Sequence, residues 1–234
     1  MSTINVNSID KESGSTLTLG GSGTTVAVHA SATTSGFDSG LASVQTFTSS
    51  GTWTRPTGIT KVIMEVQGAG GSGARRDSAP TLQAVGGAAG GYAKKLLDVS
   101  SISTATITVG TGGATPTSQG TGNSGGTSSW ADGTNTISCT GGAGGIGDSN
   151  GIPNTGGTAT GGDININGRC GFPSPLYYTI SGADSMFGEG GCWRYSTQSF
   201  DGPTGYGAGG GFNHSTNSTN NNGANGIVIV WEYK

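Results

Sequence analysis

Glycine density is the sequence feature that most restricts how this chain can fold. The stretch from Gly68 to Gly211 holds 38 of the 48 glycines, in clusters such as GAGGSG, GGAAGG, GGAGGIG and GYGAGGG. Between positions 110 and 170 the large apolar side chains are few: Trp130, Ile137, Ile146, Ile152, Ile164 and Ile166. At about 25 cal/mol per Å² of apolar surface, burying them cannot offset the entropy lost when about sixty residues become ordered. This stretch is therefore either disordered, or ordered by backbone pairing that needs no side chains.

Strand-forming sequences at both ends of the glycine-rich stretch favour order. Residues 59–67 (ITKVIMEVQ) predict the strongest strand, with Val62, Met64 and Val66 facing the core. Residues 226–233 (GIVIVWEY) are too apolar to stay unpaired, and 59–67 is the natural partner. Further strands are predicted at 44–48, 52–54, 91–99, 104–109, 127–131 and 135–140. Since no window shows an apolar period of 3.6 residues, we expect essentially no helix.

Glycine segments tied down at both ends can lie as extended helices with three residues per turn, packed closely enough for backbone hydrogen bonds between segments. Only glycine permits so close an approach. The fold class predicted is all-β: a glycine-rich, β-sandwich-like domain with packed polyglycine-type segments. The glycines assigned to this structural role are Gly68, Gly70, Gly71, Gly73, Gly141, Gly142, Gly144, Gly145, Gly209, Gly210 and Gly211.

The first forty residues differ from the rest. Apolar residues alternate with polar ones at 4/6, 17/19 and 26/28, as in short, half-buried strands separated by turns. Two apolar side chains per strand are too few for a stable monomeric sheet, so several copies should supply the missing faces. A flexible tail is the alternative. We predict two domains: residues 1–40 for attachment and trimerisation, and residues 41–234 as the glycine-rich β domain.

Charge and hydropathy exclude several classes of partner. Charged residues make up 10% of the chain and the net charge is −3, so no basic face for nucleic acid is expected. The N-terminus lacks a basic, apolar leader, and the longest apolar run, 227–231, is far too short to insert in a membrane. Cys139, Cys170 and Cys192 have no CxxC spacing and are expected to be free thiols, with a Cys170–Cys192 bridge as the alternative.

Sequence motifs for chemistry are weak. The segment 68–73 fits GxGxxG after a strand, but no amphipathic helix follows to hold a pyrophosphate, so no cofactor is expected. His29 and His214 lie in different regions, and no paired carboxylates or metal-ligand spacing occur. We therefore predict a protein that is not an enzyme, with no catalytic residue and no metal.

Aromatic residues are concentrated in residues 172–212, where Pro, Gly and Ser lie between them. Rigid rings on loops over a fixed frame are typical of recognition surfaces. The alternative is that several of these rings form a small core capping the glycine segments. The predicted receptor-binding residues are Phe172, Tyr177, Tyr178, Trp193, Tyr195, Phe200, Tyr206 and Phe212.

The chain resembles the glycine-rich domains of bacteriophage tail fibres and tail-tip adhesins over residues 46–233. The resemblance is carried by TFTSSGTWTRPTGITKVIMEVQGAGGSG, GGAAGGYAKKLLDVSSISTATITVGTGG, GGTSSWADGTNTISCTGGAGG and GYGAGGG with the closing GIVIVWEYK. It implies a virion protein, made in the host cytoplasm, in which polyglycine-type helices flanked by strands carry variable loops that contact the host. It also implies a homotrimer.

These observations lead to one expected function and one alternative. The chain would attach to other phage virion proteins through residues 1–40 and present glycine-framed loops to a host-surface glycan or outer-membrane protein. Alternatively, it is a purely structural virion component, such as a head fibre or tail connector, that binds only other phage proteins.

Overall fold

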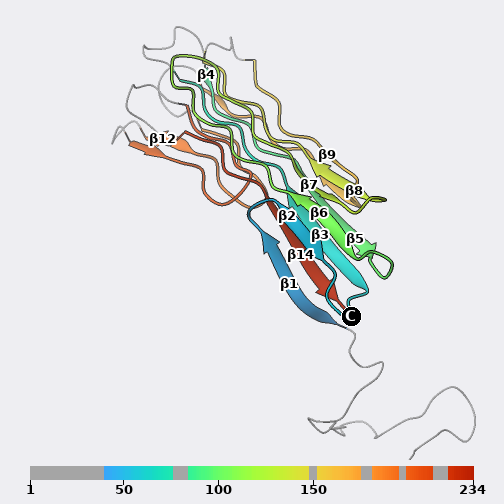
Figure 1. Ribbon diagram of the computed structural model, residues 1–234. Coiled ribbons are helices and arrows are strands. Elements are labelled where there is room, and N and C mark those ends of the chain that lie inside the picture. The colour runs from blue at the N-terminus through green and yellow to red at the C-terminus, as the bar shows by residue number, and fades with distance from the viewer. Residues whose placement is uncertain (1–39, 76–83, 148–151, 175–180, 195–198, 213–220) are drawn as a thin grey trace, which may run out of the picture. The chain divides into compact units, whose positions relative to one another are not determined.

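The computed structural model describes residues 40–75, 84–147, 152–174, 181–194, 199–212 and 221–234. Throughout these residues the secondary structure is strand, turn and extended chain, with no helix. The described body has two parts: two antiparallel sheets at the end that contains Lys234, and a bundle of extended segments at the other end (Figure 1). The predicted all-β, helix-free class is confirmed for the described part of the chain.

The first sheet, sheet A, has five strands in the order β1-β14-β3-β5-β10. Their bounds are β1 (Leu41–Phe47), β14 (Ile227–Tyr233), β3 (Lys61–Gln67), β5 (Tyr92–Asp98) and β10 (Ile164–Ile166). The predicted pairing of the terminal strand with residues 59–67 is confirmed, because β14 pairs with β3 along its whole length. The strands that precede and follow the glycine-rich stretch are thus hydrogen-bonded to each other.

The second sheet, sheet B, has the order β2-β6-β7-β8-β9. Its strands are β2 (Gly51–Thr54), β6 (Thr104–Thr108), β7 (Ser128–Ala131), β8 (Thr136–Cys139) and β9 (Ala159–Thr160). Two small antiparallel pairs complete the set: β4 (Ala84–Val85) pairs with β11 (Pro173–Ser174), which is distant in the chain, and β12 (Cys192–Arg194) pairs with the next strand, β13 (Ser199–Asp201). The strands β4 and β9 to β13 have two or three residues each, too few for a sequence signal.

The hydrophobic core lies between the two sheets. Val62, Met64 and Val66 are fully buried there, which confirms the predicted inward face of β3. Trp53 and Trp130 are also fully buried, and their ring centroids lie 4.9 Å apart. Because each sheet contributes only one face of alternating apolar residues, this core resembles that of an ordinary β-sandwich.

One buried acid belongs to the same core. Glu232 of β14 has no exposed surface, and its carboxylate accepts hydrogen bonds from the Gln45 amide at 2.7 Å, the Trp53 indole at 2.7 Å and the Ser43 hydroxyl. Three donors satisfy a group whose burial would otherwise cost several kcal/mol. The contact fixes β1 and β2 against β14.

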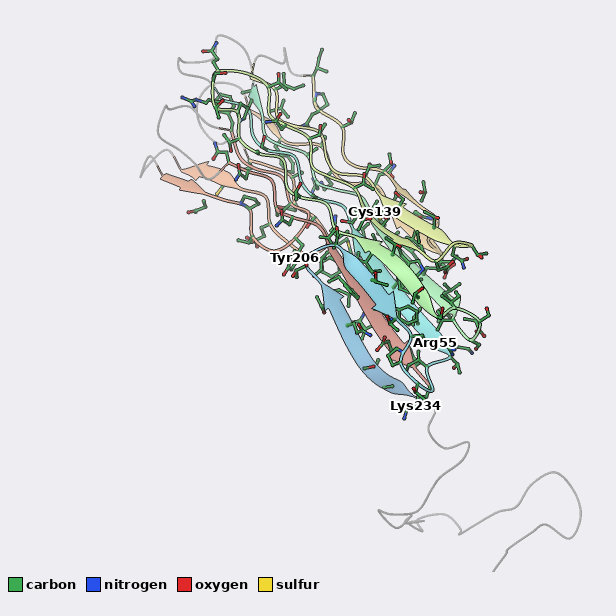
Figure 2. All side chains as sticks on the ribbon, in the orientation of Figure 1. Arg55, Cys139, Tyr206 and Lys234 are labelled. Atoms are coloured by element: carbon green, nitrogen blue, oxygen red, sulfur yellow. The ribbon has the colours of Figure 1, made fainter. Side chains whose placement is uncertain are left out.

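Beyond the strands, the chain continues as a set of extended glycine-rich segments that we call the glycine bundle. They comprise residues 68–74, 84–91, 110–113, 120–126, 140–147, 153–158, 166–171, 181–184, 188–191, 205–212 and 221–226. Few side chains fill this part of the molecule (Figure 2), where Cys139 and Tyr206 lie near the level at which the sheets give way to the bundle. Backbone groups must therefore satisfy one another.

Hydrogen bonds of the segment 68–73 repeat every three residues. Residues three apart donate to the same neighbouring segment: Gly68 to Gly91 and Gly71 to Ala88, Ala69 to Gly126 and Ser72 to Asn123, Gly70 to Ala224 and Gly73 to Asn221. The carbonyls accept from three further segments, with donors that include Gly142, Gly113 and Gly210. Six neighbours around one extended strand with a period of three is the geometry of packed polyglycine-type helices.

The segment 84–91 repeats this arrangement. Val85, Ala88 and Gly91 donate to Ile146, Ala143 and Thr140, again three residues apart. The prediction that backbone pairing orders the glycine-rich stretch is thus confirmed for the described segments. The GxGxxG match at 68–73 is accounted for by this packing, since those residues donate to protein carbonyls.

The predicted structural glycines all lie at close backbone contacts. A Cβ placed on any of them would come within 2.8 Å of a carbonyl oxygen of another segment, nearer than real Cβ atoms approach. Alanine occurs in the bundle where there is room for the methyl group, as at Ala69, Ala88 and Ala89, all fully buried. The predicted segment 1–40, except Gly40, lies outside the described residues, and so do its proposed strands.

Candidate functional site

The predicted receptor-binding aromatics do not form one surface. Phe172 is exposed, with 40% of its surface accessible, and the Arg169 guanidinium lies 4.9 Å from the centre of its ring. Arg169 was missed by the sequence reasoning, although it precedes Phe172 by three residues, one turn of a polyglycine-type helix. That period was the signal that could have identified it.

Trp193 and Phe200 lie opposite each other in the paired strands β12 and β13. Tyr206 is half-buried and lies near the junction of sheets and bundle, away from the β12 strand (Figure 2). Its backbone is held by Phe187 and Ser185, so it belongs to a different part of the molecule from Trp193. Tyr177, Tyr178 and Tyr195 lie outside the described residues.

Phe212 corrects the sequence prediction. It is 3% exposed and packs in a small cluster with Ala74 and Ala84. A ring so deeply buried is not available to a receptor. Phe212 instead caps the glycine bundle, as the alternative interpretation of the aromatic residues expected.

The described residues that flank the undescribed internal stretches lie at one end of the bundle, opposite the sheets (Figure 1). Backbone pairs hold them there: Arg75 pairs with Gly120, Val85 with Ile146, and β4 with β11. The hairpin-like pair of β12 and β13 lies at the same end (Figure 1). The aromatic-rich segments of residues 172–212 are thus attached to a hydrogen-bonded frame at several points.

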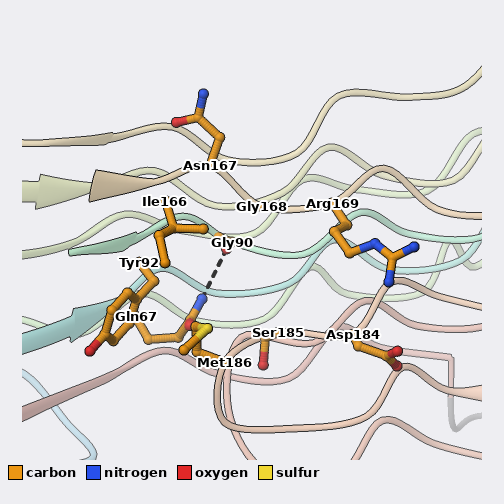
Figure 3. A pocket seen from close by; sticks show the side chains of 10 residues that line it. All are labelled: Gln67, Gly90, Tyr92, Ile166, Asn167, Gly168, Arg169, Asp184, Ser185 and Met186. Atoms are coloured by element: carbon orange, nitrogen blue, oxygen red, sulfur yellow. Dashed lines mark hydrogen bonds between the residues drawn. The ribbon is translucent and has the colours of Figure 1, made fainter. Parts of the chain in front are cut away.

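A cavity of about 230 Å³ opens elsewhere, where the outer side of sheet A meets the bundle. Figure 3 shows the residues that line it, which are Gln67, Gly90, Tyr92, Ile166, Asn167, Gly168, Arg169, Asp184, Ser185 and Met186. The Gln67 amide nitrogen donates to the carbonyls of Gly68, Gly90 and Gly91, whereas its oxygen has no partner among the described residues. The size of the cavity suits only a small group.

The ionisable groups near the cavity do not form a catalytic arrangement. Burial, followed by the charge of Glu65, raises the pKa of Tyr92 to about 12, so this phenol is neutral at physiological pH. The Ser185 hydroxyl donates to backbone carbonyls, and the Asp184 carboxylate accepts from the Gly190 amide at 2.8 Å. Among the described residues, the hydrogen-bond partners of the Ser185 hydroxyl are backbone groups.

Within the described residues, no cluster of three or more His, Cys, Asp or Glu side chains could hold a metal ion. The same residues contain no helix long and apolar enough to cross a membrane. All three cysteines are free, and the alternative Cys170–Cys192 bridge is absent. Burial raises the pKa of the Cys139 thiol to about 12, which makes it unreactive.

Comparison with protein families matches most of the chain. A family model described as a glycine-rich domain matches residues 42–233. None of the curated proteins matches the chain. The matched range coincides with the two sheets and the glycine bundle.

Proposed function

We propose that this chain, which belongs to the glycine-rich domain family, is a phage virion fibre protein that binds a host-cell surface receptor. Residues 1–40 attach it to other virion proteins, and the glycine-rich β domain presents recognition segments to a surface glycan or an outer-membrane protein. The protein is located on the virion, on a tail or capsid fibre. Its resemblance to tail-tip adhesins supports this proposal.

One structural observation carries the proposal. Backbone pairs hold the segments that flank two aromatic-rich stretches, β11 with β4 and β12 with β13, at one end of a bundle whose extended segments are hydrogen-bonded to several neighbours. Loops on a rigid frame can vary in sequence without disturbing the fold, because their roots do not depend on loop side chains. A receptor-binding protein needs this separation of frame and contact surface.

The aromatic composition supports recognition and not catalysis. Tyr177, Tyr178 and Tyr195 supply flat, amphipathic rings, and each ring contact contributes about 0.5–1.5 kcal/mol beyond its buried area. Three such contacts give modest affinity for one chain. In a homotrimer carried in several copies on one virion, weak sites would add to a strong attachment.

A binding experiment tests the proposal. Labelled full-length protein is added to a panel of bacterial strains, and bound protein is measured by flow cytometry, with the triple variant Tyr177→Ala, Tyr178→Ala, Tyr195→Ala beside it. We expect the variant to bind at least about tenfold more weakly, since three ring contacts exceed about 1.4 kcal/mol. A matched control replaces Thr104, Thr106 and Thr108 of β6 by Ala, and should bind as the parent does.

Two results would count against the proposal. Equal binding by the tyrosine variant and the parent would remove these segments from the receptor contact. Failure to bind any strain, combined with binding to a capsid or tail protein, would favour the alternative of a purely structural virion component.

A further inference from the structure

The two sheets have outer faces of opposite character. On sheet B the outward positions carry small polar side chains. They are Thr52, Thr54, Thr104, Thr106, Thr108, Ser129, Thr136, Ser138 and Thr160, with Ala131 as the one apolar member among these positions. Threonine is favoured on a strand whose side chain faces water. Sheet B therefore has the outer face expected of a solvated antiparallel sheet.

On sheet A the outward positions are mostly apolar. The register places Val44 opposite Trp231, Ile63 opposite Trp231 and Leu96, and Ile164 opposite Lys94. The apolar members of this outer face are Leu41, Val44, Ile63, Tyr92, Leu96, Ile164, Ile166, Ile227, Ile229, Trp231 and Tyr233, of which Tyr92 and Ile227 are already buried within one chain. Five of the eight exposed large apolar residues of the described chain, Leu41, Val44, Leu96, Ile164 and Ile166, lie here.

The outer face of sheet A is comparable in size with the largest patches that monomers leave open to water. Five strands about 4.8 Å apart, with up to seven residues of about 3.4 Å each, cover roughly 500 Å² of flat area, charged positions included. The largest apolar patch on a typical monomer is about 300–600 Å² and is often functional. A stable interface buries about 800 Å² of accessible surface per partner, which a corrugated face of this extent can approach.

The charges on the face are balanced within it. Lys94 forms an ion pair with Glu65 at 2.9 Å, and Lys61 lies opposite Asp98 in the β3–β5 register. The face therefore carries two positive and two negative groups and neither attracts a charged partner nor repels a second copy of itself. A flat, neutral, apolar sheet face matches best another face of the same kind.

We propose that the outer face of sheet A is the surface through which copies of this chain associate. The chain enters β1 from Gly40 at the edge of this face. The inference is independent of the proposed function, because it requires only the apolar face and its charge balance.

Thiol labelling of the full-length protein tests the proposal. In a Cys170→Ser, Cys192→Ser background, Leu96→Cys places a thiol on the outer face of sheet A, and Thr106→Cys places a matched thiol on that of sheet B. The remaining Cys139 is fully buried and stays unlabelled. Maleimide labelling rates are measured at both positions, and light scattering gives the molar mass of each variant.

The expected result has three parts. The chain has the mass of two or more copies, the thiol at position 96 is labelled at least about tenfold more slowly than the thiol at position 106, and adding Ile164→Lys restores fast labelling at position 96. Ile164 is 51% exposed, so this lysine does not disturb the fold of one chain. Position 106 should be labelled at the same rate with and without Ile164→Lys.

Several outcomes would overturn the proposal. Fast labelling at position 96 would show an open face, whatever the mass. Slow labelling at position 96 in a chain with the mass of one copy would show that another segment of the same chain covers the face. Slow labelling that persists with Ile164→Lys would show that the protection does not come from this apolar surface.

Discussion

Replacing Gly70 by Ala should test whether the glycine bundle is held by close backbone packing. Gly70 donates to the Ala224 carbonyl and accepts from the Gly113 amide, both at 2.9 Å. A Cβ at this position would overlap the carbonyl group of Ala208, far inside the closest approach that real Cβ atoms make. Ala208 in turn accepts from Ala224 at 2.8 Å. The methyl group therefore falls at a point where three segments meet.

The cost follows from the hydrogen bonds that the methyl group breaks. Relieving the overlap moves the segments apart by about 1 Å or more, which takes bonds of this length out of hydrogen-bonding range. Each buried backbone group left without a partner costs about 1–3 kcal/mol, so two broken bonds cost about 2–6 kcal/mol. Alanine has a smaller conformational entropy than glycine in the unfolded state, which offsets about 0.4–1 kcal/mol of this loss of stability. The net loss, about 1–5.5 kcal/mol, is a large share of a typical stability of about 5–15 kcal/mol.

Thermal unfolding followed by circular dichroism measures this loss. For a domain of this size we expect the midpoint of thermal unfolding to fall by about 2–22 °C, at about 2–4 °C per kcal/mol. Gly120→Ala is the matched control, because Gly120 also pairs with another segment, at Arg75. A Cβ at position 120 would meet nothing nearer than 4.0 Å. Its midpoint should stay within about 2 °C of the parent. Equal midpoints for Gly70→Ala and the parent, or equal losses for both variants, would refute the close-packing argument.

Two further predictions concern the sheets. Glu232→Ala leaves the Trp53 indole, the Gln45 amide and the Ser43 hydroxyl without an acceptor, so it should lower the free energy of unfolding by about 3–5 kcal/mol. Glu232→Gln keeps one acceptor oxygen and should lower it by less. Chemical denaturation of both variants measures the two losses, and equal losses would contradict the hydrogen-bond account. Tyr92 has a pKa raised from 10.0 to about 12 by burial, so the folded state holds this proton more tightly than the unfolded state, and stability should fall as pH rises from about 10 to 12. Tyr92→Phe should flatten that part of the pH profile, and a profile identical to the parent's would show that Tyr92 does not cause it.

Much of the fold was predictable because long strands leave periodic sequence signals. The alternation of Val62, Met64 and Val66 identified the inward face of β3, and the apolar terminal segment could find a partner only in a strand of similar length. Strands of two or three residues, such as β9 (Ala159–Thr160), were missed, because pairs so short are set by neighbouring segments and not by their own composition.

The candidate site was less predictable. The density of aromatic residues marked residues 172–212 correctly as unlike the rest, but composition does not tell an exposed ring from a buried one. Phe212 is covered because the bundle places Ala74 and Ala84 against it, while Phe172 projects beside Arg169. Exposure depends on which segments come together, and the segments that cover Phe212 are distant from it in the chain.

The sequence alone determined that this chain is all-β in its described part and that its glycines serve as backbone packing positions. Glycine clusters with few apolar side chains leave backbone pairing as the one way to order, and the strong strands at 59–67 and 226–233 close the stretch. The tertiary structure alone decided which neighbours each segment has, where the cavity beside Gln67 opens, and that sheet A keeps an apolar outer face. The reason is physical. Strand alternation shows which side chains share one face of a strand, whereas only the packing of sheet B against one face of sheet A decides which of those faces is covered.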